Sequence, residues 1–83
     1  MTLQDICNRC SKFSGWNLVV TVEDGKIWFR DPAATGQSWL IVYLRGSELA
    51  EAYGRMSHWA ITRQEAEVMR RALVSAGTTA GGN

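Results

Sequence analysis

Apolar and polar positions alternate with a helical period at the start of the chain. The apolar residues recur at i, i+3, i+4, i+7 and i+10: Leu3, Ile6, Cys7, Cys10 and Phe13. This spacing places them on one face of a helix over residues 2–14. Thr2 and Asp5 have the spacing of a capping box at its start, and Gly15 tolerates the left-handed conformation that commonly ends a helix. We therefore expect an amphipathic N-terminal helix.

The next segment changes to a period of two, which predicts a β-hairpin. Residues 17–23 and 26–31 flank Asp24-Gly25, a dipeptide that suits a type I′ turn because both central residues of that turn have positive φ. A two-residue turn sets the register: Val22 faces Ile27, Thr21 faces Trp28, Val20 faces Phe29 and Val19 faces Arg30. Side chains alternate between the two faces of a strand. We expect the core face to carry Leu18, Val20, Val22, Ile27 and Phe29, and the second face to carry Val19, Thr21, Trp28 and Arg30.

A third strand is predicted over residues 39–44, after a loop of small residues over 31–38. Pro32 ends the second strand, because proline cannot donate a hydrogen bond to a strand ladder. The third strand is apolar on both faces, so it is either buried on both sides or carries an interface. It is also a possible sheet edge, and the pairing of two such edges is one route to a dimer.

Helical spacing returns in the C-terminal part of the chain. Ser47 suits an N-cap, and the apolar residues that follow it predict a helix to about Ser57: Leu49, Ala52, Tyr53 and Met56. Residues 58–61 are predicted as a short connector or a fourth strand. Thr62 and Glu65 form a second capping box, which opens a helix that ends at Gly77. The buried side of this last helix is expected to carry Val68, Met69, Ala72, Leu73 and Ala76.

The sequence thus predicts one α+β domain over residues 1–77 with the order α-β-β-β-α-α, and a flexible C-terminal tail over 78–83. The domain would hold an N-terminal helix, a three-stranded antiparallel meander and two C-terminal helices. The 83 residues are 46% hydrophobic and 20% charged, which is typical of soluble globular proteins. No run of about 18 apolar residues and no basic-then-apolar leader occurs, so we expect a cytoplasmic protein without a membrane segment.

No pattern in the sequence predicts a catalytic site, a cofactor or a metal, so we expect a protein that is not an enzyme. Cys7 and Cys10 form a C-x-x-C pair, but both lie on the apolar stripe, where a free cysteine packs as a small hydrophobe. A structural zinc needs four ligands, and this pair with His58 supplies three. A metal shared between two copies, or a redox role for the two thiols, remains the alternative. His58 lacks the framing of a catalytic motif.

The four tryptophans of this short chain are the first functional indication, because tryptophan is enriched in protein interfaces. The second sheet face is predicted to carry an aromatic and arginine patch, the composition of interface hot spots: Trp28, Arg30, Trp39, Ile41 and Tyr43. Two interpretations are open. Either the C-terminal helices cover this face and bury it, or the face binds a second copy or another protein.

Nucleic-acid binding is the alternative function, with Arg70 and Arg71 touching phosphate and the exposed aromatic side chains stacking on bases. The formal net charge of +1 argues against it, because counterion release from nucleic acid needs an excess of cations.

The compact α-β-β-β-α-α plan, the hairpin at Asp24-Gly25 and the helix over 62–76 without a catalytic signature resemble small accessory proteins of bacteriophages and prophages. Many of these block a host protein by occupying its surface, as anti-CRISPR and other anti-defence proteins and inhibitors of host motors or regulators do. The resemblance implies a homodimeric protein of the host cytoplasm that binds and inhibits a host protein without catalysis. It implies no particular site residue.

Overall fold

The computed structural model describes residues 1–34, 36, 38–55 and 59–76. It holds, in chain order, α1 (Leu3–Ser14), β1 (Val19–Glu23), β2 (Lys26–Arg30), β3 (Trp39–Arg45), β4 (Glu48–Tyr53) and α2 (Arg63–Ser75). The predicted flexible tail over 78–83, the predicted helix end at Gly77, and His58 lie outside the described residues.

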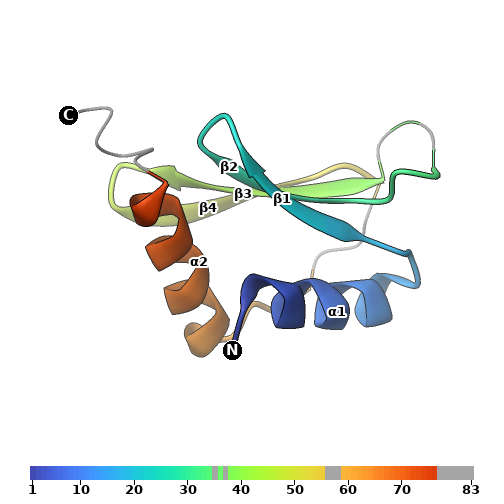
Figure 1. Ribbon diagram of the computed structural model, residues 1–83, viewed down its shortest axis with the longest axis horizontal. Helices are drawn as coiled ribbons and strands as arrows, with labels where there is room; N and C mark the ends of the chain where they lie inside the picture. Colours follow the sequence, from blue (N-terminus) through green and yellow to red (C-terminus); the bar gives the residue numbers. More distant parts are fainter. Residues whose placement is uncertain (35, 37, 56–58, 77–83) are drawn as a thin grey trace.

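The four strands form one antiparallel sheet in the order β1-β2-β3-β4. Both helices lie on the same side of this sheet, so the fold has two layers (Figure 1). We call the side toward the helices the inner face and the opposite side the outer face. The prediction of an α+β fold with an N-terminal helix and an antiparallel meander is confirmed.

The first hairpin has the predicted turn and register. Asp24 and Gly25 have φ values of 53° and 74°, and β1 and β2 pair as the sequence indicated, from Val19 opposite Arg30 to Glu23 opposite Lys26. Local chemistry decided this hairpin, because few residue pairs other than Asp-Gly accept two successive positive φ angles.

The segment after β3 is a strand, and the helix predicted from Ser47 is wrong. Gly46, at φ 64°, and Ser47 make a two-residue turn between Arg45 and Glu48, and the chain returns antiparallel to β3. Alanine and glutamate favour helices by only a few tenths of a kcal/mol per residue, which six-residue pairing along β3 outweighs. Within the described residues the sheet therefore has four strands instead of three, one C-terminal helix follows instead of two, and β3 is internal and not an edge.

Residues 59–61 belong to neither a strand nor a helix, so of the two alternatives for 58–61 the connector holds in its described part, and the fourth strand lies at 48–53. This connector nevertheless contributes Trp59, which is 1% exposed and the largest fully buried side chain among the described residues. The sequence pattern gave no sign of this, because an isolated tryptophan in a connector has no periodicity.

The two remaining helices begin as predicted. At the start of α1 the Asp5 N–H donates to Thr2 Oγ1 at 3.2 Å and the Thr2 N–H donates to Asp5 Oδ2 at 2.8 Å. At the start of α2, Thr62 and Glu65 exchange the same two hydrogen bonds at 3.0 Å each. Three apolar residues that were predicted on the core side are exposed: Phe13 at 51%, Val22 at 41%, and Ala76.

The core lies between the inner face and the helices, and its buried members are Ile6, Cys7, Cys10, Leu18, Ile27, Phe29, Leu40, Val42, Trp59, Met69 and Leu73. The predicted packing of the two cysteines in the core is confirmed, since both are 0% exposed and unbridged.

Candidate protein-binding site

The five residues that the sequence singled out lie together on the outer face. In the ladder between β2 and β3, Trp28 is directly opposite Ile41 and Arg30 is directly opposite Trp39. Tyr43 follows two positions after Ile41 on β3, so its side chain points to the same side. The strand pairing alone thus places all five side chains on one surface.

Neither helix covers this surface, because α1 and α2 both pack on the inner face (Figure 1). Of the two interpretations of the second sheet face, burial by the helices does not hold for the described part of the chain. Each of the five side chains is nevertheless only partly exposed. We call Trp28, Arg30, Trp39, Ile41 and Tyr43 the aromatic patch.

Arg30 is held along the surface of the patch. Its guanidinium carbon lies 4.7 Å from the ring centroid of Trp28, and its Nη2 donates to Glu23 Oε2 at 2.7 Å. The Thr21 hydroxyl donates to the same carboxylate oxygen at 3.0 Å. These two donors, the hydroxyl first, lower the pKa of Glu23. The ion pair is exposed and contributes little to stability, but it orients the guanidinium over the indole.

The indole of Trp28 carries an unused donor. Its Nε1 is buried and has no hydrogen-bond acceptor among the described residues. An unpaired buried donor costs about 1–3 kcal/mol.

Strand β4 borders the aromatic patch with small side chains. Ala52 is opposite Ile41 and Ala50 is opposite Tyr43, so small side chains adjoin large ones on the outer face. Beyond them the Gly54 N–H donates to the Trp39 carbonyl oxygen at 2.9 Å. This side of the site was not predicted, because the apolar spacing after Ser47 is that of a helix, whereas the segment is a strand. The signal for it was the Gly46-Ser47 dipeptide, a common two-residue hairpin connection.

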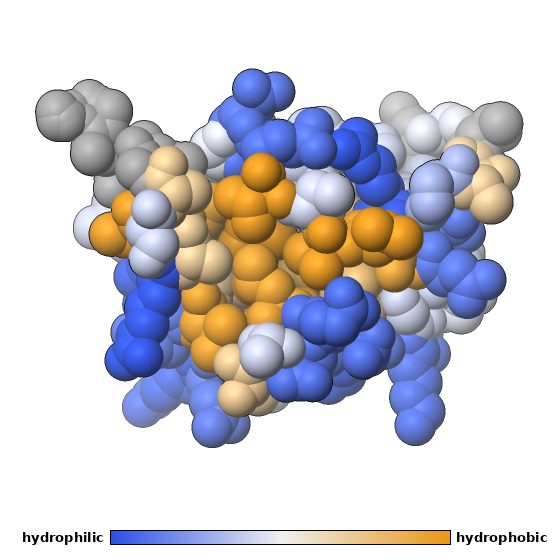
Figure 2. Space-filling model, in the orientation of Figure 1, coloured by the Kyte–Doolittle hydropathy of each residue, from blue (hydrophilic) through white to orange (hydrophobic). Residues whose placement is uncertain are grey.

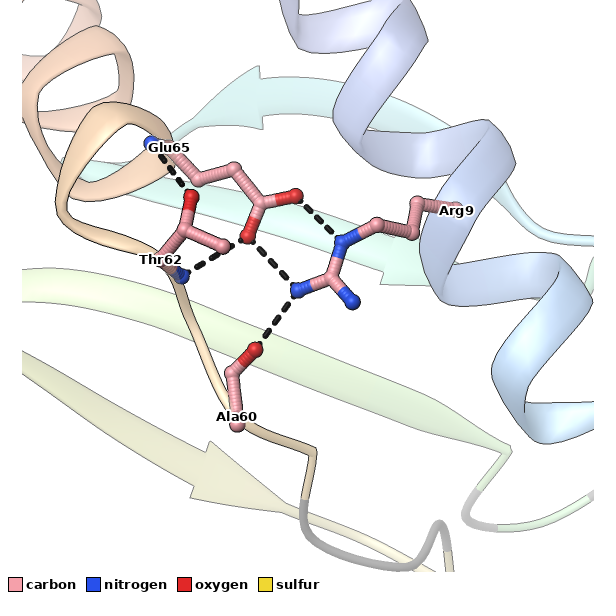
Figure 3. Close-up of polar contacts among 4 residues, drawn as sticks. All are labelled: Arg9, Ala60, Thr62 and Glu65. Atoms are coloured by element: carbon pink, nitrogen blue, oxygen red, sulfur yellow. Dashed lines mark hydrogen bonds and ion pairs between the residues drawn. The ribbon is translucent and has the colours of Figure 1, made fainter.

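A second polar cluster, also missed from sequence, joins the two helices on the other side of the molecule (Figure 3). Arg9 of α1 meets Glu65 of α2 through two hydrogen bonds, Nε to Oε2 at 2.5 Å and Nη2 to Oε1 at 2.8 Å. The same Nη2 donates to the Ala60 carbonyl at 2.6 Å. The guanidinium also lies 4.4 Å from the ring centroid of Trp59. We call Arg9, Ala60, Thr62 and Glu65 the helix clamp.

Burial and charge show what the helix clamp does. Glu65 is 3% exposed, and Arg9, followed by the Thr62 N–H, lowers the pKa of its carboxyl group. A nearly buried carboxylate needs such partners to remain charged. Both guanidinium-to-carboxylate hydrogen bonds run from α1 to α2, so the clamp ties the two helices together.

The two cysteine thiols are unsuited to nucleophilic chemistry. Burial raises the pKa of Cys7 and raises that of Cys10 to about 12, and Cys7 Sγ donates to the Leu18 carbonyl at 3.3 Å. The thiolate is the reactive form of cysteine, and it is suppressed at both positions. Within the described ranges no three His, Cys, Asp or Glu side chains are grouped as metal ligands.

Arg70 and Arg71 do not join the aromatic patch. Both lie on α2, which packs on the inner face, and both are ion-paired with Glu67 at 3.2 Å. Arg70 also lines a small open pocket of about 290 Å³ with Leu44, Gly46, Ser47 and Val74. The structure therefore separates the phosphate contacts of the nucleic-acid hypothesis from its stacking platform.

Comparison with protein-family models, with curated proteins and with solved structures gave no match to this chain. Among the described residues no helix has the length and apolar character that crossing a membrane requires.

Proposed function

We propose that this protein is a non-enzymatic modulator that binds another protein through the aromatic patch, in the manner of a phage-encoded inhibitor of a host protein. The observation that carries the proposal is the position of Trp28, Arg30, Trp39, Ile41 and Tyr43 on a sheet face that the helices leave uncovered. Tryptophan, tyrosine and arginine are the residues that most often dominate binding energy at protein interfaces.

The charges around the patch indicate the chemistry of the partner. Among the described residues of the outer face, three cations stand against two acids: Lys26, Arg30 and Arg45 against Glu23 and Glu48. The partner would therefore have an apolar centre and an acidic rim, because complementary charge favours encounter and fixes orientation. Binding of this kind in the host cytoplasm would modulate the partner by occupying its surface.

The test has two steps. Immobilised protein is first incubated with a nuclease-treated bacterial lysate, and any stoichiometric partner is identified and purified. Its affinity is then measured by calorimetry against the wild type and against the Trp28→Ala/Trp39→Ala variant. Losing a hot-spot tryptophan costs about 2 kcal/mol or more, so we expect the affinity to fall by at least about 30-fold.

A matched control removes two exposed apolar side chains that lie off the patch, in Phe13→Ala/Val74→Ala. These side chains are 51% and 53% exposed, and the control should bind as the wild type does. Equal affinity of the wild type and a folded Trp28→Ala/Trp39→Ala variant would contradict the proposal. So would a partner that is captured from an untreated lysate but not from the nuclease-treated lysate.

A further inference from the structure

Strand β1 is an edge of the sheet, and its backbone is only partly used. It pairs with β2 on one side, and it stands at one end of the strand order. Glu23 and Lys26 flank the two-residue turn and so form a hydrogen-bonded pair. By alternation, Val19, Thr21 and Glu23 direct their backbone groups toward β2, whereas Val20 and Val22 direct theirs away from the sheet.

Both ends of this edge are already occupied. Leu18 has the same orientation as Val20 and Val22, and α1 takes up its backbone: the Leu18 N–H donates to Ser11 Oγ at 3.0 Å and its carbonyl accepts from Cys7 Sγ at 3.3 Å. At the other end the Asp24 carbonyl accepts from Lys26 Nζ at 3.4 Å. The outward groups of Val20 and Val22 have no such partner within the described part of the chain.

The side chains of this edge are also more open than those of the other strands. Val19 is 49% exposed on the outer side and Val22 is 41% exposed on the inner side. Figure 2 shows apolar residues gathered below the sheet, between the two helices, so apolar surface is exposed on the inner side of the molecule. An apolar edge strand with free ladder positions is a template for pairing with another strand.

We infer that the occupant of this edge is a second copy of the same chain, paired antiparallel through β1 so that Val20 lies opposite Val22 of the second copy. In this register each of the two Val20–Val22 pairs across the interface exchanges two backbone hydrogen bonds. These four hydrogen bonds use all the outward N–H and C=O groups of Val20 and Val22 in both copies. Thr21 meets Thr21 of the second copy at the two-fold axis. Glu23 comes opposite Val19, which neighbours Arg30, so no like charges face each other.

This inference goes beyond the proposed function and is independent of it, because the aromatic patch does not take part in the pairing. The two-fold axis is perpendicular to the sheet, so the outer faces of both copies lie on the same side. The dimer has one continuous eight-stranded sheet and carries two aromatic patches on one surface. A partner would meet two equivalent sites, and its apparent affinity would rise by effective concentration if both were engaged.

Cysteine cross-linking tests the register. Thr21→Cys places two thiols at a non-hydrogen-bonded pair with Cα atoms about 4.5 Å apart, within the range of a disulfide. Val19→Cys is the matched control on the same strand and face. In the proposed register the thiols of the two copies at position 19 would be four residues apart along the strand, roughly 13 Å. Val19 is more exposed than Thr21, so exposure alone would favour cross-linking at position 19. Under mild oxidation we expect a covalent dimer from Thr21→Cys and little from Val19→Cys, and the buried Cys7 and Cys10 should not contribute.

The mass in solution provides the second measurement. The wild type should sediment as a dimer, and Val22→Pro should sediment as a folded monomer, because proline removes an outward N–H without touching the hairpin ladder. The inference is overturned if the wild type stays monomeric at protein concentrations up to about 1 mM, where even weak association would be detected. It is equally overturned by a dimer that survives Val22→Pro, by preferential cross-linking of Val19→Cys, or by a dimer that depends on Trp28 and Trp39 instead.

Discussion

The two faces of the sheet carry apolar side chains at comparable density but differ in what covers them. On the inner face Ile27, Phe29, Leu40 and Val42 are each 0% exposed beneath the helices. On the outer face Trp28, Trp39, Ile41 and Tyr43 are on average larger, yet each remains partly exposed. The inner face therefore holds the buried core, and the outer face leaves part of its apolar area in contact with solvent. Such area on a small protein marks an interaction surface.

The sharpest test of this difference compares two neighbours on β2 that point to opposite faces. Phe29→Ala opens a cavity in the core and should lower the free energy of unfolding by about 3–5 kcal/mol. Trp28→Ala removes a larger side chain from the outer face, but it also removes an unpaired buried donor, and should cost only about 1 kcal/mol. Urea denaturation followed by circular dichroism measures both. Similar losses for the two variants would mean that the outer face is also a stabilising core.

The helix clamp closes the inner layer, and removing it should have the next largest effect. Arg9→Ala leaves the nearly buried Glu65 carboxylate without its main partner, so we expect a loss of about 2 kcal/mol in the free energy of unfolding. Arg71→Ala breaks an exposed ion pair with Glu67 on α2 and serves as the control, with a loss below about 0.5 kcal/mol. Chemical denaturation at neutral pH compares them. If both variants lose equally little, the clamp does not hold the helices together.

Acid should weaken the inner layer before it affects the outer face. The pKa of Glu65 is lowered in the folded protein, so its contribution to stability is complete above 4.5, the ordinary pKa of glutamate, and is lost as the pH falls through the lower folded value. The urea concentration at the midpoint of unfolding should therefore decrease when the pH is lowered below 4.5. Glu65→Gln should be less stable at neutral pH and less sensitive to acid.

The outer face supplies the control for this pH dependence. Glu23→Gln should change the profile much less, because Glu23 and Arg30 are both exposed to solvent, at 46% and 41%. Asp5, whose pKa the Thr2 hydrogen bonds lower, keeps some acid sensitivity in both variants. Identical profiles for the wild type and Glu65→Gln would show that the clamp carboxylate is not charged in the folded protein.

The parts of the fold that local chemistry decides were predictable from the sequence. Asp24-Gly25 determined the first hairpin and its register, and the two capping boxes determined where α1 and α2 begin. Because the alternation along 17–31 and 39–44 assigns faces, it also placed the five residues of the aromatic patch together. These features depend on residues that are close in sequence or joined by a tight turn.

The parts that depend on distant contacts were not predictable. The segment over 48–53 has residues that favour a helix, and only its pairing with β3 makes it a strand. Whether the outer face is covered depends on where the helices pack, which no pattern within them shows. The pairing of Arg9 with Glu65 joins residues 56 positions apart, and alone in the sequence each reads as an ordinary surface charge.

That separation has a consequence for how the protein is made. At a translation rate of about 5–20 residues per second, Arg9 exists for roughly 3 to 11 seconds before Glu65 has been added. During this interval the first hairpin can form from local contacts, whereas α1 lacks the helix to which it is clamped. The nascent chain therefore exposes its apolar inner face until α2 has been synthesised, and this is the stage at which chaperones and proteases compete for it.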